Sequence, residues 1–122
     1  MFDFFTPTHP FGGQTLRLAA QAQQGGGDVF DIARTCNKIE PGDKDGWERE
    51  WLALAQQIET KAKQALAAGH KQTAIQYFFH ANQYYRMSDV FLTIAQESKK
   101  AERFRKAQEN FRAAAKIGRA HV

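Results

Sequence analysis

Residues 45–69 read DGWEREWLALAQQIETKAKQALAAG, and they carry the clearest periodicity in the chain. Apolar side chains recur there every three or four positions, as they do along one face of an α-helix. These side chains are Trp47, Trp51, Leu54, Ile58, Ala62 and Ala65. Asp45 or Gly46 is expected to begin this helix and Gly69 to end it. The pattern predicts a helix that buries one face against a neighbour.

The following residues, 71–87, predict a second and more apolar helix. Its apolar positions cover more than half of the circumference: Ala74, Ile75, Tyr77, Phe78, Phe79, Ala81, Tyr84 and Tyr85. A helix that is apolar on so many sides is expected at the centre of a bundle, with neighbours on more than one side.

Two shorter helices are expected before this pair. Residues 14–24 predict one helix, which the glycines at 25–27 end. Asp28 is a plausible N-cap for another, which runs to about Asn37. Pro41-Gly42-Asp43 then marks a turn.

Two helices are also expected after the pair. Ser88 would cap a short helix that contains Phe91, Leu92 and Ile94. Ser98 or Lys99 would begin a last helix, whose apolar face is Ala101, Phe104, Ala107, Phe111 and Ala114. No stretch alternates apolar and polar residues between turn signals, as a strand would. The predicted fold is therefore all-α, a bundle of about five to six helices.

The size and composition of the chain fit one globular unit. The chain has 122 residues, of which 43% are hydrophobic and 12% aromatic, too apolar for a disordered chain. Residues 1–12 hold two prolines and four Phe and are expected to form an irregular arm. Residues 13–116 are expected to form the helical domain.

The last six residues, 117–122, read IGRAHV. One reading frame of a common sequencing-library adapter, ATC GGA AGA GCA CAC GTC, translates to the same six residues. We therefore interpret them as a translated adapter, so they are not used to infer the fold and His121 is not a ligand candidate. Without Arg119 the net charge falls from +4 to +3.

Several classes of protein are not indicated by the sequence. The start of the chain lacks a basic segment followed by an apolar run, so it does not resemble a secretory signal. No apolar run approaches the roughly 20 residues that span a bilayer. Cys36 is the only cysteine, so an internal disulfide is excluded and a reducing, cytoplasmic setting is expected. No membrane partner is expected.

Known catalytic motifs are missing from the sequence. Neither Ser88 nor Ser98 has the flanking glycines of a nucleophile elbow. No P-loop, dinucleotide fingerprint or H-E-x-x-H motif occurs. We therefore expect no catalytic residue, no cofactor and no metal site in this chain.

Two local features have a chemical and a structural interpretation. Cys36 could act as a nucleophile with His70 or His80, but its position on a helix face favours a buried structural thiol. Residues 43–46, Asp-Lys-Asp-Gly, resemble the start of a calcium loop. The Glu required at loop position 12 is replaced by Leu54, which favours a turn and a helix cap.

One polar group stands out on the aromatic helix. His80, Asn82, Tyr85 and Arg86 lie within residues 79–86. They are candidates for contact with a small-molecule substrate in a pocket that another domain closes. The alternative, which we favour, is that His80 is a core histidine hydrogen-bonded to a neighbouring helix.

Residues 98–116 contain seven basic and two acidic residues. Such a helix can contact phosphates. Its basic residues, however, point in several directions, which favours a solvated face and no nucleic-acid partner.

The pair of helices from Trp47 to Ile94 is also similar to one tetratricopeptide unit. That repeat needs several copies about 34 residues apart, and no second copy is found. A repeat array is therefore not indicated, and a free-standing helical interaction module is kept as the alternative function.

Three segments together resemble a known family. They are Gly25-Gly-Gly-Asp28 through Asp43, then Trp47 through Ala55, and finally Ala74 through Arg86 with the later Phe91, Leu92 and Phe111. Their order resembles the N-terminal helical region of a family of α/β-hydrolases. That family includes 2,6-dihydroxypseudooxynicotine hydrolase, fungal polyketide-shortening hydrolases and, more distantly, FrsA-like esterases.

The resemblance implies a Ser-His-Asp hydrolase domain after Lys116, which would be the main partner of this chain. Relatives of this kind hydrolyse either the C–C bonds of aromatic ketones or the acyl bonds of esters and similar compounds. Their helical segment covers the active site and can aid formation of a homodimer. None of the family's triad motifs lies in these residues, so the chain alone is expected to be inactive. Because two consecutive helices are rich in rings, the chain alone is also expected to expose an apolar patch.

Overall fold

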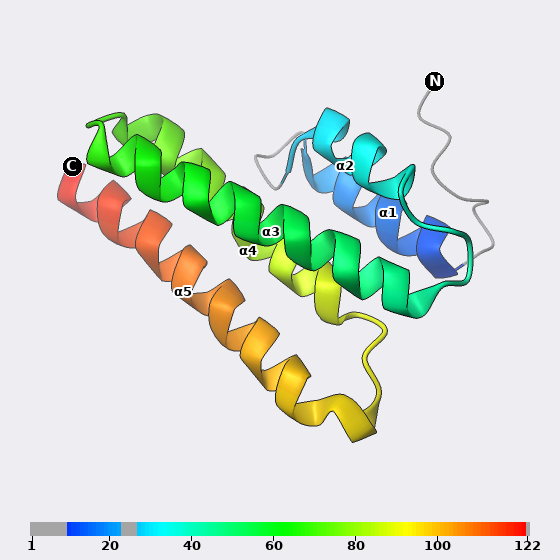
Figure 1. Cartoon of the computed structure of the whole chain (residues 1–122). Coiled ribbons are helices and arrows are strands. Elements are labelled where there is room, and N and C mark those ends of the chain that lie inside the picture. Colours follow the sequence, from blue (N-terminus) through cyan, green and yellow to red (C-terminus); the bar gives the residue numbers. More distant parts are fainter. Residues whose placement is uncertain (1–9, 23–26, 122) are drawn as a thin grey trace.

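The computed structural model describes residues 10–22 and 27–121, and they form an all-α bundle (Figure 1). The helices are α1 (Pro10–Ala22), α2 (Val29–Cys36), α3 (Lys44–Ala67), α4 (Lys71–Asp89) and α5 (Glu97–His121), with a short 3₁₀ helix, η1 (Ile94–Gln96), before the last one. No β-strand occurs in these ranges. The predicted fold class is confirmed.

The centre of the molecule is the antiparallel hairpin of α3 and α4. Gly69 makes the turn possible because its φ of +82° lies in the left-handed region, where a side chain would be strained. The His70 N–H donates to the Ala65 carbonyl at 2.9 Å, and the Gly69 N–H donates to the Leu66 carbonyl at 3.0 Å. These two bonds are a Schellman motif, which satisfies carbonyls at the end of α3.

An aromatic cluster holds α1 and the loop before η1 against this hairpin. The Trp47 ring lies 4.6 Å from Phe11 on α1, 5.2 Å from Phe91 and 5.6 Å from Trp51, measured between ring centroids. The Trp47 indole N–H donates to the Met87 carbonyl of α4 at 2.7 Å. Both tryptophans are completely buried, so the predicted apolar stripe of α3 faces the core.

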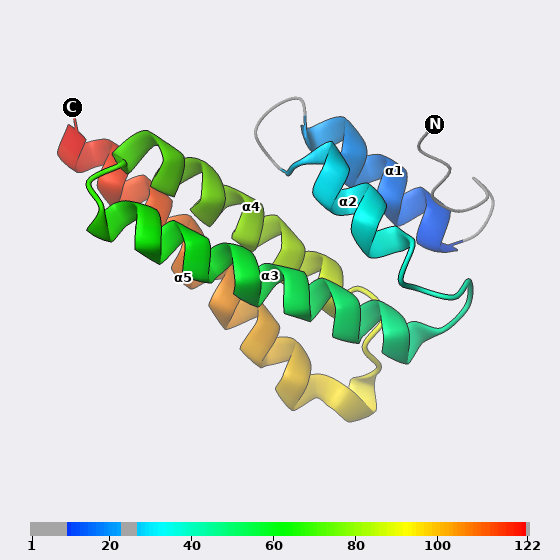
Figure 2. The ribbon, with the colours of Figure 1, turned by 45° about the horizontal axis from the view of Figure 1, so that its top comes forward.

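Helices α1 and α2 form a second pair, beside the N-terminal end of α3 and the C-terminal part of α4 (Figure 2). Asp28 is the N-cap of α2, as predicted: its carboxylate accepts from the N–H of Phe30 at 2.7 Å and of Asp31 at 3.2 Å. The backbone N–H of Asp28 donates to the Tyr84 hydroxyl at 2.9 Å. The cap is therefore tied directly to α4.

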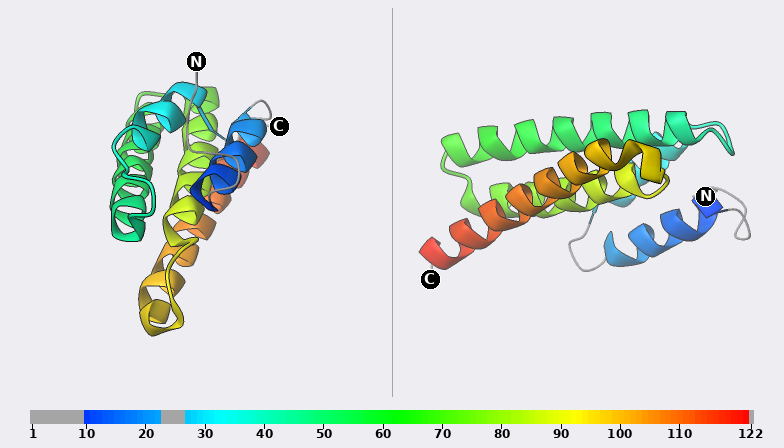
Figure 3. Two further views of the ribbon diagram at one scale, coloured as in Figure 1. Left: turned by 90° about the vertical axis from the view of Figure 1, so that its right-hand side faces the viewer. Right: turned by 90° about the horizontal axis from the view of Figure 1, so that it is seen from below.

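Helix α5 packs along α4 on the other side of the hairpin (Figure 3). Ala107 and Ala114 are buried against it, as predicted, but Phe104 and Phe111 are 50% and 51% exposed. Arg103 and Asn110 are buried in their place. The predicted face of α5 was wrong for its two rings and for Ala101, which is also exposed, because polar contacts with α3 set the rotation of this helix.

Two predicted boundaries also differ from the structure. Ser88 does not cap a new helix: it lies inside α4, is buried, and donates to the Tyr85 carbonyl at 2.6 Å. Residues 90–96 contain only the 3₁₀ helix, whose start is stabilised by the Thr93 N–H bonding to Gln96 Oε1 at 3.1 Å. Helix α1 begins at Pro10, inside the expected arm 1–12, because proline is well suited to a first helical position. Residues 1–9 lie outside the described residues.

Within residues 10–22 and 27–121, none of the helices combines the length and the apolar character that a membrane crossing requires.

Replacement of Trp51 by Ala tests the aromatic cluster. Loss of a fully buried ring should lower the free energy of unfolding by roughly 3–5 kcal/mol, because it removes apolar burial and leaves a cavity. Urea unfolding followed by circular dichroism would measure the change. The control Gln57→Ala, on an exposed position of the same helix, should stay within about 0.5 kcal/mol of the parent. Equal stability of the two variants would contradict this packing.

Candidate functional site

The four candidate residues on α4 point in three directions. Adjacent residues of a helix lie about 100° apart around its axis, so a group spread over positions 80–86 cannot share one face. His80 lies beside α2, Tyr85 lies in the interior between α3 and α5, and Asn82 and Arg86 lie beside α5. The structure brings together only Asn82 and Arg86.

His80 is half-buried beside Tyr77 and Tyr84, with ring centroids 6.4 and 6.2 Å away. Its Nδ1 atom finds no hydrogen-bond partner among the described residues. Burial lowers the pKa of His80, and the nearby carboxylates of Asp31 and Asp28 only partly oppose this effect. His80 is therefore a neutral ring at neutral pH. The favoured interpretation was a core histidine hydrogen-bonded to a neighbouring helix, and the structure shows a half-buried ring whose Nδ1 lacks that bond.

Tyr85 belongs to a buried polar cluster. Its hydroxyl donates to Glu59 Oε1 of α3 at 2.6 Å, and its side chain is almost completely buried. Burial raises the pKa of Tyr85, and the Glu59 carboxylate beside it raises it further. The hydroxyl thus stays a hydrogen-bond donor at any physiological pH and is not exposed to a ligand.

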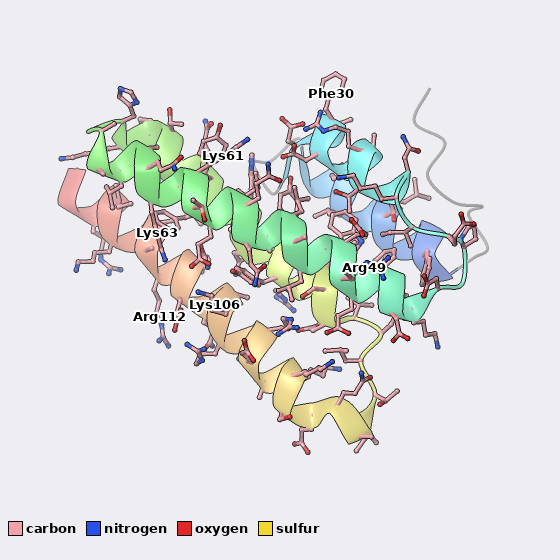
Figure 4. The ribbon with its side chains drawn as sticks, in the orientation of Figure 1. Phe30, Arg49, Lys61, Lys63, Lys106 and Arg112 are labelled. Atoms are coloured by element: carbon pink, nitrogen blue, oxygen red, sulfur yellow. The ribbon has the colours of Figure 1, made fainter. Side chains whose placement is uncertain are left out.

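Two residues of α5 complete this cluster, which we call the Glu59 cluster (Glu59, Lys63, Tyr85, Lys106 and Asn110). Lys106 Nζ lies 2.9 Å and Asn110 Nδ2 lies 3.2 Å from Glu59 Oε2. Lys63 of α3 is a more distant partner at 3.7 Å. Figure 4 shows Lys63 and Lys106 on the facing sides of α3 and α5. One carboxylate therefore binds donors from two other helices.

The surroundings of Glu59 determine its charge. Burial alone would raise its pKa, but hydrogen bonds from Tyr85 and Lys106, together with the charges of Lys106 and Lys63, lower it below its ordinary value. Glu59 is therefore ionised at neutral pH and matched by cations. A second ion pair, Arg103 to Glu48 at 3.1 Å, joins α5 to α3 nearer the start of both helices.

Asn82 and Arg86 line a groove between α4 and α5. We call it the α4/α5 groove and define it by six of its lining residues: Asn82, Arg86, Phe104, Gln108, Phe111 and Arg112. Its volume is about 370 Å³. The Asn82 amide donates to the Ala107 carbonyl at 2.7 Å, which joins the two walls at the floor of the groove. The groove combines two rings with guanidinium and amide groups.

The remaining candidates have structural roles. Cys36 is buried, and its sulfur lies 3.8 Å from the Thr15 hydroxyl. Burial raises the pKa of this thiol to about 11, so it is a protonated core residue, as predicted. Asp43 caps α3 through a bond from the Gly46 N–H at 3.0 Å, which agrees with the predicted turn and cap.

The sequence prediction missed the Glu59 cluster, although a signal for it exists. Glu59 follows Ala55 by four positions and Trp51 by eight, which places its carboxylate on the apolar stripe of α3. A charged residue on a buried face requires partners from another element. The identity of those partners depends on α5, 47 and 51 positions further along the chain.

Replacement of Glu59 by Gln tests the cluster. The variant should lose roughly 1–3 kcal/mol of folding free energy at pH 7, because buried donors lose a charged acceptor. Since folding lowers the pKa of Glu59, its contribution is present above the ordinary value of 4.5 and is lost as the pH falls below it. The free energies of unfolding of the parent and of the variant should therefore become equal in acid. The exposed-loop control Glu40→Gln should differ little from the parent at any pH. A gap for Glu59→Gln that persists unchanged into strongly acidic solution would refute the role of ionised Glu59.

Comparison with known proteins finds relatives that are named hydrolases. The chain is 33% identical over 92 residues to a protein named hydrolase acrC of Aspergillus aculeatus, a match that covers 75% of this chain and 21% of that protein. It is 29% identical over 89 residues to the alpha/beta hydrolase ucsC of an Acremonium species, covering 73% of this chain and 18% of the relative. It is also 29% identical over 82 residues to 20-hydroxy-prefusarin hydrolase FUS2 of Gibberella moniliformis, covering 67% and 20%.

Neither of the other two comparisons gave a match: no family model matches the chain, and no solved structure matches it. The chain spans about a fifth of the length of the curated relatives it matches. The resemblance inferred from the residues is therefore confirmed: this helical bundle is similar to a limited region of fungal hydrolases, among them two named alpha/beta hydrolases and the hydrolase FUS2.

Proposed function

We propose that this chain is the N-terminal helical region of a serine α/β-hydrolase that cleaves C–C, ester or similar acyl bonds. Two facts together support the proposal. The relatives are named hydrolases, and each is about five times as long as the region that they share with this chain. The chemistry would then reside in the part of the protein that lies outside the shared region.

The role of the helical region would be to cover the substrate entrance of the catalytic part. A cover of this kind excludes water from the pocket and positions the substrate against the catalytic residues. The partly exposed Phe104 and Phe111 supply an apolar surface for contact with another part of the protein. Asn82 and Arg86, at the same groove, would supply polar contacts.

Two observations favour this role over the other function classes. The α3–α4 hairpin is followed by the single long helix α5 in the described chain, whereas a tetratricopeptide array needs repeated hairpins of similar length. The basic residues Lys99, Arg103 and Lys106 of α5 lie within 4 Å of Glu48 or Glu59. This pairing reduces the positive potential that a phosphate backbone would require.

Serine-directed labelling of the intact parent protein tests the proposal. The parent, obtained by extending the coding sequence, should react with a fluorophosphonate probe at a serine in a G-x-S-x-G motif. The 122-residue chain should not react, because it lacks that motif. Mass spectrometry of the labelled peptide would locate the serine. A parent that contains no such motif and does not react would overturn the proposed function.

A further inference from the structure

We propose that the α4/α5 groove is the surface on which the rest of the parent hydrolase docks, through a segment that carries a carboxylate beside an apolar side chain. This inference rests on the proposed function and goes beyond it by naming the docking face and the chemistry of the segment. Three observations support it: the exposed rings of the groove, its two guanidinium groups that form no ion pair with the described residues, and the length of the relatives outside the matched region.

The apolar part of the groove consists of two rings on one side of α5. Phe104 and Phe111 are seven positions apart, two helical turns, and each is about half exposed. Phe111 also meets Phe79 of α4 edge-on, with ring centroids 5.8 Å apart. Apolar residues that are exposed side by side often mark a contact surface, whereas single exposed apolar residues are common and need no explanation.

The charged part of the groove consists of Arg86 on α4 and Arg112 on α5. Neither guanidinium forms an ion pair with a carboxylate of the described residues, whereas Arg103, Arg105 and Lys106 of α5 each do. Figure 4 shows Arg112 on the side of α5 away from α3. A guanidinium binds a carboxylate through two parallel hydrogen bonds, so an acidic side chain is the partner that these residues select.

The floor of the groove is fixed before any partner arrives. The Asn82 amide holds the Ala107 carbonyl, and the Glu59 cluster fixes the rotation of α5 on its other side. Because the walls are already positioned, docking would not require ordering of this surface, which lowers the entropic cost of association.

The occupant is inferred from length and charge. About four-fifths of each curated relative lies outside the region matched by this chain, so a covalently attached neighbour would be present at high effective concentration. A second copy of this chain fits less well. A two-fold contact through the same groove would bring the Arg86 and Arg112 side chains of both copies together, and like charges in an interface are unfavourable.

Hydrogen exchange compares the groove in the intact parent and in the 122-residue chain. The backbone amide hydrogens of residues 104–112 of α5 should exchange at least roughly tenfold more slowly in the intact parent than in the 122-residue chain. The outer positions of α3 around Lys61 should exchange at similar rates in both proteins. Equal exchange of residues 104–112 in the two proteins would overturn the inference. Slower exchange that depends on protein concentration, with a dimeric mass in solution, would assign the groove to a second copy and also overturn it.

Charge reversal then tests the acidic partner. In the intact parent, Arg86→Glu with Arg112→Glu should accelerate proteolytic release of the helical region several-fold. The matched control, Lys38→Glu with Lys61→Glu, makes the same change of charge at exposed positions outside the groove and should not. Circular dichroism of each variant confirms that the helices remain folded. Equal release by the two variants would overturn the inference. Continued fluorophosphonate labelling in that case would leave the proposed function intact, whereas a parent that never reacts would remove both.

Discussion

The structure depends most on the need to satisfy one buried carboxylate. Glu59 lies on the core face of α3, where an ionised group is costly unless it is paired and hydrogen-bonded. Tyr85 of α4 and Lys106 and Asn110 of α5 supply those bonds at 2.6–3.2 Å. Because the donors come from two helices, the carboxylate fixes both the position of α4 against α3 and the rotation of α5. A purely apolar contact would leave that rotation less defined.

The rotation of α5 explains which part of the sequence prediction succeeded. In α3 and α4 most buried side chains are apolar or aromatic, so hydrophobic periodicity identified Trp47, Trp51 and Tyr84 as core residues. In α5 the same criterion selected Phe104 and Phe111. Each of these rings is one position from a residue that the structure buries, Arg103 or Asn110. One position is about 100° around the helix, and Ala107 and Ala114 are buried as predicted, so α5 is turned by less than one position from the apolar prediction. This turn follows from the contacts of α5 with Glu48 and Glu59 of α3. Such tertiary contacts cannot be read from the hydrophobic periodicity of α5.

The candidate site was predicted in part for a similar reason. Asn82 and Arg86 are four positions apart and share a face, so their proximity could be expected from the sequence. His80 and Tyr85 lie on other faces by the same geometry, which helical spacing alone could have shown. The functions of those two side chains could not be predicted, because each depends on a distant element: Asp28 and Asp31 of the α2 region for His80, and Glu59 of α3 for Tyr85.

The polar interior and the apolar exterior of α5 are linked by one geometric cause. A helix has a fixed circumference, so turning Lys106 and Asn110 toward Glu59 necessarily turns Phe104 and Phe111 toward the α4/α5 groove. Burial of both rings within this bundle would break the bonds of an ionised carboxylate, which costs more than the exposure of two half-covered rings. The exposed rings are therefore a stable property of the folded bundle rather than a packing defect. The bundle can therefore hold its own shape and still present an apolar surface on α5.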